Sequence, residues 1–180
     1  MAINFIKTAL TDYRVGALTR SSHFVARRVV QELLPAYRRI VEYGPGDGAI
    51  TKLLLQQLPA DGKILAIESN PDFARGLKNI ADVRLQVVEA LAQEVSKDFA
   101  AFGWQKIEAV FSGIPFSFLN PDLRQRIVDQ TYNALEPGGI FLVYQYSTLM
   151  APYLKKRFKK VVVKFEPRNF PPYFLMIAKK

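Results

Sequence analysis

The sequence predicts an α/β protein with a largely parallel sheet, from three observations. From Arg39 onward, short apolar runs alternate with longer amphipathic segments, as strands alternate with crossover helices. The first apolar run leads into a glycine-rich turn at 44–48, which a helical pattern follows at once. Near the C-terminus, two apolar runs at 159–166 and 173–179 are joined by a proline-rich turn without a helix, which predicts an antiparallel hairpin.

The elements follow in chain order, each an apolar run or an amphipathic segment bounded by turn residues. Asn70-Pro71 starts one helix, because proline fits the first helical turn, and Glu136-Pro137-Gly138-Gly139 stops another. The remaining strands are predicted at 39–43, 63–68, 83–88, 107–112 and 139–146. Helices between them are predicted at 49–58, 71–79, 94–101, 121–135 and, with a basic composition, 149–157.

The residues before the sheet predict two further helices. Residues 2–13 place apolar side chains on one helical face, so this helix could cap the core, cover a ligand site or lie among lipid headgroups. A loop then ends in Ser21-Ser22, whose hydroxyls can cap a helix at about 22–34. We assign 1–38 to these capping helices and 39–180 to the sheet, as parts of one domain.

Size and composition limit the classes of protein to consider. A chain of 180 residues suits one domain with one core. It lacks cysteine, which excludes disulfides and thiolate chemistry, and we expect no metal site. It shows neither a signal peptide nor an apolar run of about eighteen residues. We therefore expect a cytoplasmic protein without a membrane span.

The net charge of +9 is concentrated at the two ends of the chain. Residues 1–40 carry seven Lys or Arg and two acids, residues 151–180 carry nine and one, and the segment between carries nine and thirteen. Both ends of a doubly wound sheet can lie near the ligand crevice, where their cations would face a polyanion. The polyanion could be a membrane surface or a nucleic acid. In a third interpretation, the basic residues only keep the protein soluble.

The turn at 44–48 fits two kinds of nucleotide cofactor. Its alternate glycines let the backbone approach a ligand, and the next helix points free N–H groups at the same place. Gly44, Gly46 and Ala49 satisfy the dinucleotide pattern, with Glu68 about twenty residues further on. A dehydrogenase would need a separate substrate domain, for which this chain has no room.

The better match is E-x-G-x-G-x-G at Glu42, Gly44, Gly46 and Gly48, which resembles motif I of the class I S-adenosylmethionine-dependent methyltransferases. In that family the acid two residues before the first glycine lies near the methionine end of the cofactor, where an ammonium favours a carboxylate. The resemblance implies S-adenosylmethionine as cofactor. It also implies a Rossmann-like seven-stranded sheet with its last strand antiparallel.

Ligands of such sheets bind beyond the carboxyl ends of the strands. Glu68 there has two carboxylate oxygens for both ribose hydroxyls. Glu89 could accept from an adenine amino group, or be merely solvated. The expected cofactor-binding residues are Glu42, Tyr43, Gly44, Pro45, Gly46, Gly48, Glu68, Ser69, Glu89, Ala90 and Ser112.

The stretch Ser112-Gly113-Ile114-Pro115-Phe116 resembles motif IV of methyltransferases that act on amino groups. Ribosomal RNA adenine dimethyltransferases begin this motif with Asn, whereas bacterial phospholipid N-methyltransferases use Ser-Gly-x-Pro. The chain resembles the lipid family also at residues 14–17, Ser21-Ser22, Gln145-Tyr146 and 168–172. The resemblance thus extends from about residue 14 to the end, with departures at Arg20 and Tyr173, where that family commonly has Pro and Ala.

Methyl transfer from a sulfonium needs a neutral nitrogen held in line with the methyl group. Tyr146, after the fifth strand, is our candidate for holding or relaying the acceptor's proton, although core packing is an equal alternative for it. Aromatic faces could hold the methylated cation. The expected substrate-binding residues are Ser112, Gly113, Ile114, Pro115, Phe116, Tyr146, Tyr153 and Asn169.

These features predict an N-methyltransferase of phosphatidylethanolamine or a related amino-lipid, peripherally associated with an anionic membrane surface. One alternative is an RNA or small-amine N-methyltransferase. The other is a non-catalytic protein of the same fold that binds membrane or nucleic acid. The sequence leaves the oligomeric state open.

Overall fold

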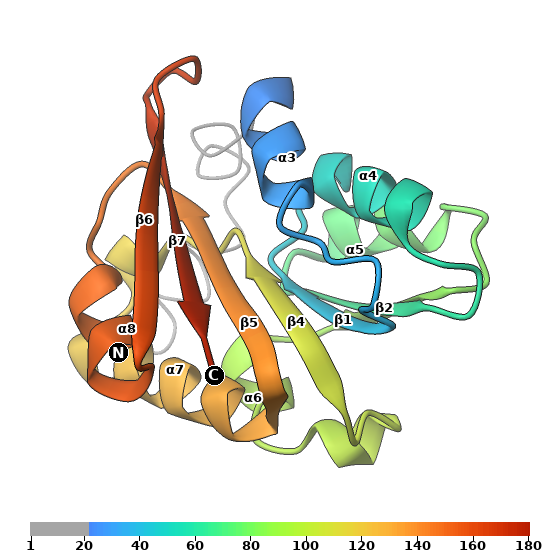
Figure 1. Cartoon of the computed structure of the whole chain (residues 1–180). Coiled ribbons are helices and arrows are strands. Elements are labelled where there is room, and N and C mark those ends of the chain that lie inside the picture. The colour runs from blue at the N-terminus through green and yellow to red at the C-terminus, as the bar shows by residue number, and fades with distance from the viewer. Residues whose placement is uncertain (1–21) are drawn as a thin grey trace.

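The computed structural model describes residues 22–180, so the helix predicted at 2–13 lies outside the described residues. Its strands are β1 Arg39–Tyr43, β2 Lys63–Glu68, β3 Leu85–Glu89, β4 Ile107–Ser112, β5 Leu135–Gln145, β6 Lys160–Glu166 and β7 Tyr173–Lys179. They form one seven-stranded sheet in the order β3-β2-β1-β4-β5-β7-β6 (Figure 1). The first five strands are parallel, and β7 runs antiparallel to both β5 and β6. The predicted sheet, with its last strand reversed, is confirmed.

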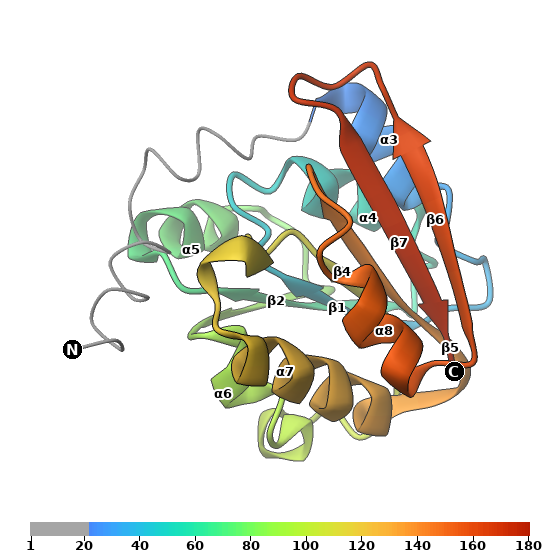
Figure 2. The same cartoon turned by 90° about the vertical axis from the view of Figure 1, so that its left-hand side faces the viewer.

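Helices pack on both faces of this sheet (Figure 2). They are α3 His23–Val30, α4 Ala49–Gln57, α5 Pro71–Lys78, α6 Ala92–Val95, α7 Pro121–Ala134 and α8 Ala151–Arg157, with 3₁₀ turns η1 Phe99–Phe102 and η2 Phe116–Phe118. Because strand side chains alternate, β1 sends Ile40 into the core beneath α3 and α4, and Val41 and Tyr43 into the core beneath α6, α7 and α8. The buried strands are therefore apolar on both faces.

The differences from the predicted elements have local causes. The helix predicted at 94–101 is wrong, because the chain forms α6 and then a separate turn η1, capped by Asp98. The helix predicted at 22–34 ends at Val30. The strand predicted to begin at 139 begins at Leu135, since its first residue pairs with Ile107 across an irregular register. The other bounds differ by two residues or fewer.

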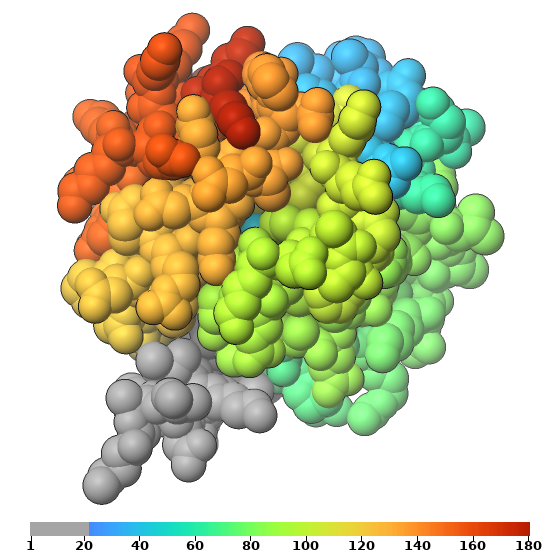
Figure 3. All heavy atoms as spheres, turned by 90° about the horizontal axis from the view of Figure 1, so that it is seen from below, coloured from blue at the N-terminus to red at the C-terminus, as the bar shows by residue number. Residues whose placement is uncertain are grey.

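The basic C-terminal cluster, defined as Lys155, Lys156, Arg157, Lys159 and Lys160, lies at the amino edge of the sheet. Since β6 is parallel to β1, Lys160 marks the edge opposite the strand carboxyl ends, and it pairs there with Lys179. The expectation that both basic ends rim the crevice is therefore wrong for this end. Figure 3 shows the molecule from below Figure 1, with α7 beside residues 96–105.

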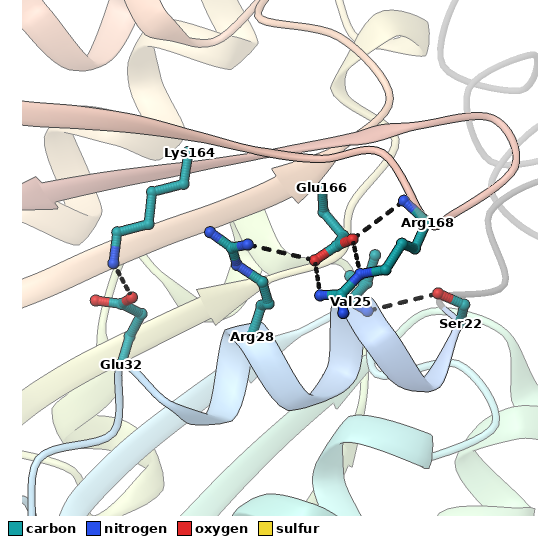
Figure 4. Close-up of polar contacts among 7 residues, drawn as sticks. All are labelled: Ser22, Val25, Arg28, Glu32, Lys164, Glu166 and Arg168. Carbon is teal, nitrogen blue, oxygen red and sulfur yellow. Dashed lines mark hydrogen bonds and ion pairs between the residues drawn. The ribbon is translucent and has the colours of Figure 1, made fainter.

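Helix α3 is tied to the β6–β7 hairpin by polar contacts (Figure 4). The fully buried carboxylate of Glu166 accepts from Arg168, with Nε 2.7 Å away, and forms an ion pair with Arg28 at 3.5 Å. Lys164 pairs with Glu32 at the other end of the helix. Of the two serines predicted to cap this helix, Ser22 caps α3 by accepting from Val25 N. These contacts hold the hairpin and the start of α3 in one fixed relation.

Within residues 22–180, no helix is both long and apolar enough to cross a bilayer.

Candidate functional site

Backbone hydrogen bonds join the loops that follow β1, β2, β3 and β4 into one continuous edge. Gly44 N donates to Ile67 O at 2.9 Å, and Ala90 N donates to Glu68 O at 3.0 Å. On the other side, Gly113 N donates to Tyr43 O at 2.9 Å. The structure thus brings together the glycine loop, both acidic strand ends and the loop at 112–116.

The glycine loop has a backbone that other residues rarely adopt. Gly44, Gly46 and Gly48 have φ angles of 64°, 59° and 76°. A Cβ placed on Gly46 would meet no atom within 4 Å, so open space lies beside this residue. A Cβ on Gly48 would instead lie 2.9 Å from Leu77 of α5. Gly48 is therefore required by packing, whereas Gly46 leaves room for a ligand.

Glu68 fastens the glycine loop to the end of β2. Its side chain is buried, with Oε2 accepting from Gly46 N at 3.0 Å and Oε1 accepting from Asn70 N at 2.8 Å. Burial raises the pKa of Glu68, and these backbone donors act against that rise. Each carboxylate oxygen can accept a second hydrogen bond, so ribose hydroxyls fit here. The sequence had not indicated that Glu68 also holds the loop.

Glu42 lies beneath the same loop with no exposed surface. Its Oε2 accepts from Thr51 Oγ1 at 2.7 Å, and no described residue donates to Oε1. Burial raises the pKa of Glu42 to about 8, with Glu68 and Asp47 adding to the rise. A buried carboxyl oxygen without a donor is rare in folded proteins and suits a ligand that brings one. The expected ammonium would do so.

The other expected cofactor residues lie on the same edge but in different surroundings. The Tyr43 side chain points into the core, with its hydroxyl 3.1 Å from Thr131 Oγ1. Ser69 is half-buried, and Glu89 is exposed. Ser112 is buried, and its Oγ accepts from Ile114 N at 3.4 Å. Tyr43 therefore presents its backbone, not its ring, to the loops.

Gly113 marks the closest approach between the acceptor loop, residues 112–116, and its neighbours. A Cβ there would lie 2.6 Å from the Tyr144 hydroxyl and 3.0 Å from Gly44 O. Tyr144 is buried at the end of β5, and burial, then the charge of Glu42, raises its pKa well above the usual value. Tyr144 is not among the site residues predicted from the sequence, because a buried aromatic residue near the end of an apolar strand reads as core.

The expected acceptor residues divide between the rim and the core. The Tyr146 side chain is 40% exposed, and its hydroxyl lies 2.9 Å from Ser117 Oγ. The Phe116 ring is fully buried in the core beneath α7 and α8. Its carbonyl accepts from Arg124 Nε at 2.9 Å, a brace that the sequence did not indicate. On α8, the Tyr153 ring already has the charged groups of Arg124 and Lys156 at 5.9 and 5.7 Å.

Asn169 has a positioning role in the described structure. Its Oδ1 accepts from Ser22 N at 2.8 Å, and its Nδ2 donates to Pro171 O at 2.7 Å. Both ends of the amide are thus used to hold the hairpin turn against α3.

No group of three or more His, Asp or Glu side chains suited to a metal ion occurs among residues 22–180. A pocket of about 360 Å³ lies between α7 and residues 96–105, with Lys97, Asp98 and Asn133 in its lining. It lies toward the amino edge, away from the glycine loop, and contains none of the predicted site residues.

No family model matches the chain, but curated proteins do. The chain is 28% identical over 162 residues to the ornithine lipid N-methyltransferase of Singulisphaera acidiphila, covering 88% of this chain and 84% of that protein. It is 35% identical over 100 residues to the ribosomal RNA small subunit methyltransferase A of Acidithiobacillus ferrooxidans. That match covers 54% of this chain and 36% of the relative.

Solved structures decide the fold. The 16S rRNA N2 G1207 methyltransferase of T. thermophilus, in complex with AdoMet and guanosine, aligns with a TM-score of 0.65 and 19% identity over 89% of this chain and 44% of that one. The 1,6-didemethyltoxoflavin-N1-methyltransferase of Burkholderia thailandensis, bound to S-adenosylhomocysteine, aligns with a TM-score of 0.71 and 17% identity over 99% and 86%. The chain has the class I methyltransferase fold. The resemblance to class I methyltransferases, inferred from the glycine loop, is confirmed for the fold. These two structures contain S-adenosylmethionine and its demethylated product, respectively.

Proposed function

We propose that this class I methyltransferase transfers a methyl group from S-adenosylmethionine to the amino group of phosphatidylethanolamine or a related amino-lipid, at a membrane surface. The observation that carries the proposal is the extent of the similarity to the ornithine lipid N-methyltransferase, 88% of this chain and 84% of that protein. A match of that extent includes more than the cofactor loop.

The site residues fit the cofactor. Glu68 would accept from the ribose hydroxyls, the open space beside Gly46 would admit the ligand, and Glu42 would offer the cofactor ammonium an oxygen that has no donor among the described residues. When bound, S-adenosylmethionine supplies an activated methyl group. The chain contributes position, because in-line transfer requires the acceptor nitrogen at contact distance.

The acceptor loop supplies the oxygens that orient the amine. Ser112 lies at its base, and Gly113 allows the loop to approach the glycine loop closely. We assign Tyr146 to holding the proton that the ammonium must lose, with Ser117 as the next hydroxyl in the chain of hydrogen bonds. Exposure of Tyr146 at the rim is consistent with a proton that leaves to water.

The experiment is incubation of the protein with radiolabelled S-adenosylmethionine and, separately, with vesicles containing phosphatidylethanolamine or ornithine lipid, total RNA, or free ethanolamine. We expect label in the lipid fraction, and none with a Gly46→Val variant. Label only in RNA or free amine would contradict the lipid assignment. Cofactor binding without label in any fraction would support the non-catalytic alternative.

A ribosomal RNA methyltransferase is the second candidate. Its support is the higher identity to the RNA methyltransferase relatives, 31% over 111 residues and 35% over 100 residues. These matches span only 43% and 36% of the relatives' own lengths. Ser112 also stands where the RNA adenine dimethyltransferases have Asn. The RNA arm of the labelling experiment tests this candidate directly.

A further inference from the structure

The turn between β6 and β7, residues 167–172, presents an apolar side chain to solvent. Phe170 is 98% exposed, and its neighbours Pro171 and Pro172 are exposed as well. The turn projects beyond the sheet at the top of Figure 1. An aromatic ring that is almost wholly exposed buries little apolar surface within this fold, and it is accessible to a binding partner.

This turn is braced from within. The buried carboxylate of Glu166 accepts from the backbone N of Arg168 at 3.1 Å and from its guanidinium at 2.7 Å (Figure 4). Asn169 bonds Ser22 N on one side and Pro171 O on the other. The ring of Phe170 is therefore held outward by its neighbours' hydrogen bonds. Such preorganisation lowers the entropy cost of binding a partner.

The turn shares its edge of the sheet with the candidate site. Because β6 is parallel to β1, β4 and β5, its carboxyl end lies at the same edge as the glycine loop and the acceptor loop. Two further exposed aromatics lie on that edge, Phe118 after β4 and Tyr146 after β5, at 42% and 40% exposure. Residues 167–172 include one cation, Arg168, and no acid. Arg168 is already paired with Glu166, so the exposed ring of Phe170, in a turn without an acid, is the feature that suits the boundary between headgroups and acyl chains.

We propose that the turn 167–172 is the membrane-contacting end of the protein, with Phe170 entering the headgroup and acyl boundary of a lipid surface. The inference rests on the proposed function: a lipid acceptor keeps its chains in the bilayer, so the loop that receives its amine must face that surface. It places the membrane at the carboxyl edge, opposite the basic C-terminal cluster.

The first test measures binding to vesicles of phosphatidylethanolamine and phosphatidylglycerol by sedimentation, without S-adenosylmethionine. Phe170→Ser should weaken binding about tenfold, the effect of losing one buried aromatic ring. The matched control is Val83→Ser, because Val83 is equally exposed but lies before β3 at the opposite edge, and it should bind like wild type. Equal binding by Phe170→Ser and wild type, or no binding by wild type, overturns the proposal.

The second test locates the ring. Trp104 is the only tryptophan and is buried, so wild type gives the background signal. Phe170→Trp should be quenched by vesicles of brominated lipid, and wild type should not. If the fluorescence of Phe170→Trp is not quenched, the proposal is overturned. The proposal is also overturned if Phe170→Ser differs from wild type only in its oligomeric mass or in its affinity for RNA.

A third measurement separates this inference from the function on which it rests. Methylation of lipid dispersed in detergent micelles does not require docking on a bilayer. If micellar lipid is methylated but Phe170→Ser binds vesicles normally, the contact surface is wrong and the function stands. If Phe170→Trp is quenched but no lipid is methylated in either form, the contact surface stands and the assigned function is wrong.

Discussion

At the residue scale, Glu68 and Gly46 form one unit. The Glu68 carboxylate accepts from Gly46 N and so fixes the glycine beside which open space lies. The same carboxylate is the expected acceptor for the ribose hydroxyls. Loop geometry and cofactor recognition therefore depend on one side chain.

Replacement of this side chain tests that dependence. Glu68→Ala should weaken S-adenosylmethionine binding by about 2 kcal/mol or more, because it removes a charged acceptor and frees the loop. Isothermal titration calorimetry on the folded variant measures the loss. Asp61→Ala is the matched control, since Asp61 is an exposed acid just before the opposite end of the same strand. Unchanged affinity in Glu68→Ala would mean that the cofactor site lies elsewhere.

Gly46 allows a steric test with a matched control for backbone strain. Gly46→Val should abolish cofactor binding while the protein still folds, because the new side chain enters the open space that the ligand needs. Its φ of 59° adds strain of about 1–2 kcal/mol. Gly103→Val carries similar strain, at φ 80° with nothing within 4 Å, far from the loop. Calorimetry and circular dichroism on both variants decide it: equal affinities would contradict the assigned site.

At the element scale, the joint between α3 and the hairpin depends on Glu166. Hydrogen bonds from Arg168 hold the pKa of Glu166 at about 2, below the ordinary 4.5. A group whose pKa is lower in the folded state contributes stability that is present above the unfolded pKa and is lost as pH falls toward the folded pKa. This contribution should therefore disappear between about pH 4.5 and pH 2.

Glu166→Gln should destabilise the protein by about 2 kcal/mol at pH 7, because two arginines lose their counter-charge. Its stability should fall less steeply than that of wild type between pH 4.5 and pH 2. Urea denaturation at several pH values measures both effects. Glu32→Gln, which removes the partly exposed partner of Lys164, should cost about 1 kcal/mol or less. Parallel pH profiles for Glu166→Gln and wild type would refute this role.

At the scale of the whole molecule, charge and exposed aromatics lie on opposite edges of the sheet. The basic C-terminal cluster follows α8 to the amino edge, whereas Phe118, Tyr146 and Phe170 lie at the carboxyl edge. At physiological salt, exposed charges act over about 8 Å. The cluster is thus too far away to strengthen contact at the opposite edge.

This separation predicts the outcome of a charge reversal. The double variant Lys155→Glu, Lys156→Glu should bind anionic vesicles within about threefold of wild type at physiological salt. Flotation measures the affinity for vesicles. Phe170→Ser is the comparison variant, and its affinity for the same vesicles should fall. Release of the double variant from vesicles, with Phe170→Ser still bound, would place the membrane at the amino edge and reverse the proposed orientation.

The sequence alone determined the order of strands and helices, the glycine loop and the acceptor loop, because these depend on local signals. Alternation of apolar runs with helical patterns predicts parallel strands, and glycines at 44, 46 and 48 match the left-handed backbone that the loop adopts. The caps at Ser22 and Asn70 were equally local. Where the signal was ambiguous, as at residues 94–101, the prediction was wrong.

Contacts between residues distant in the chain were decided only by the tertiary structure. Nothing in the residues around Tyr144 indicates that its hydroxyl meets Gly113, and nothing near Asn169 indicates that its amide is used by Ser22. The location of the basic C-terminal cluster likewise depends on the direction of β6, which the pairing with β7 sets. A sequence pattern indicates which side chains of a segment are buried. The segment against which they pack is decided only when the sheet forms.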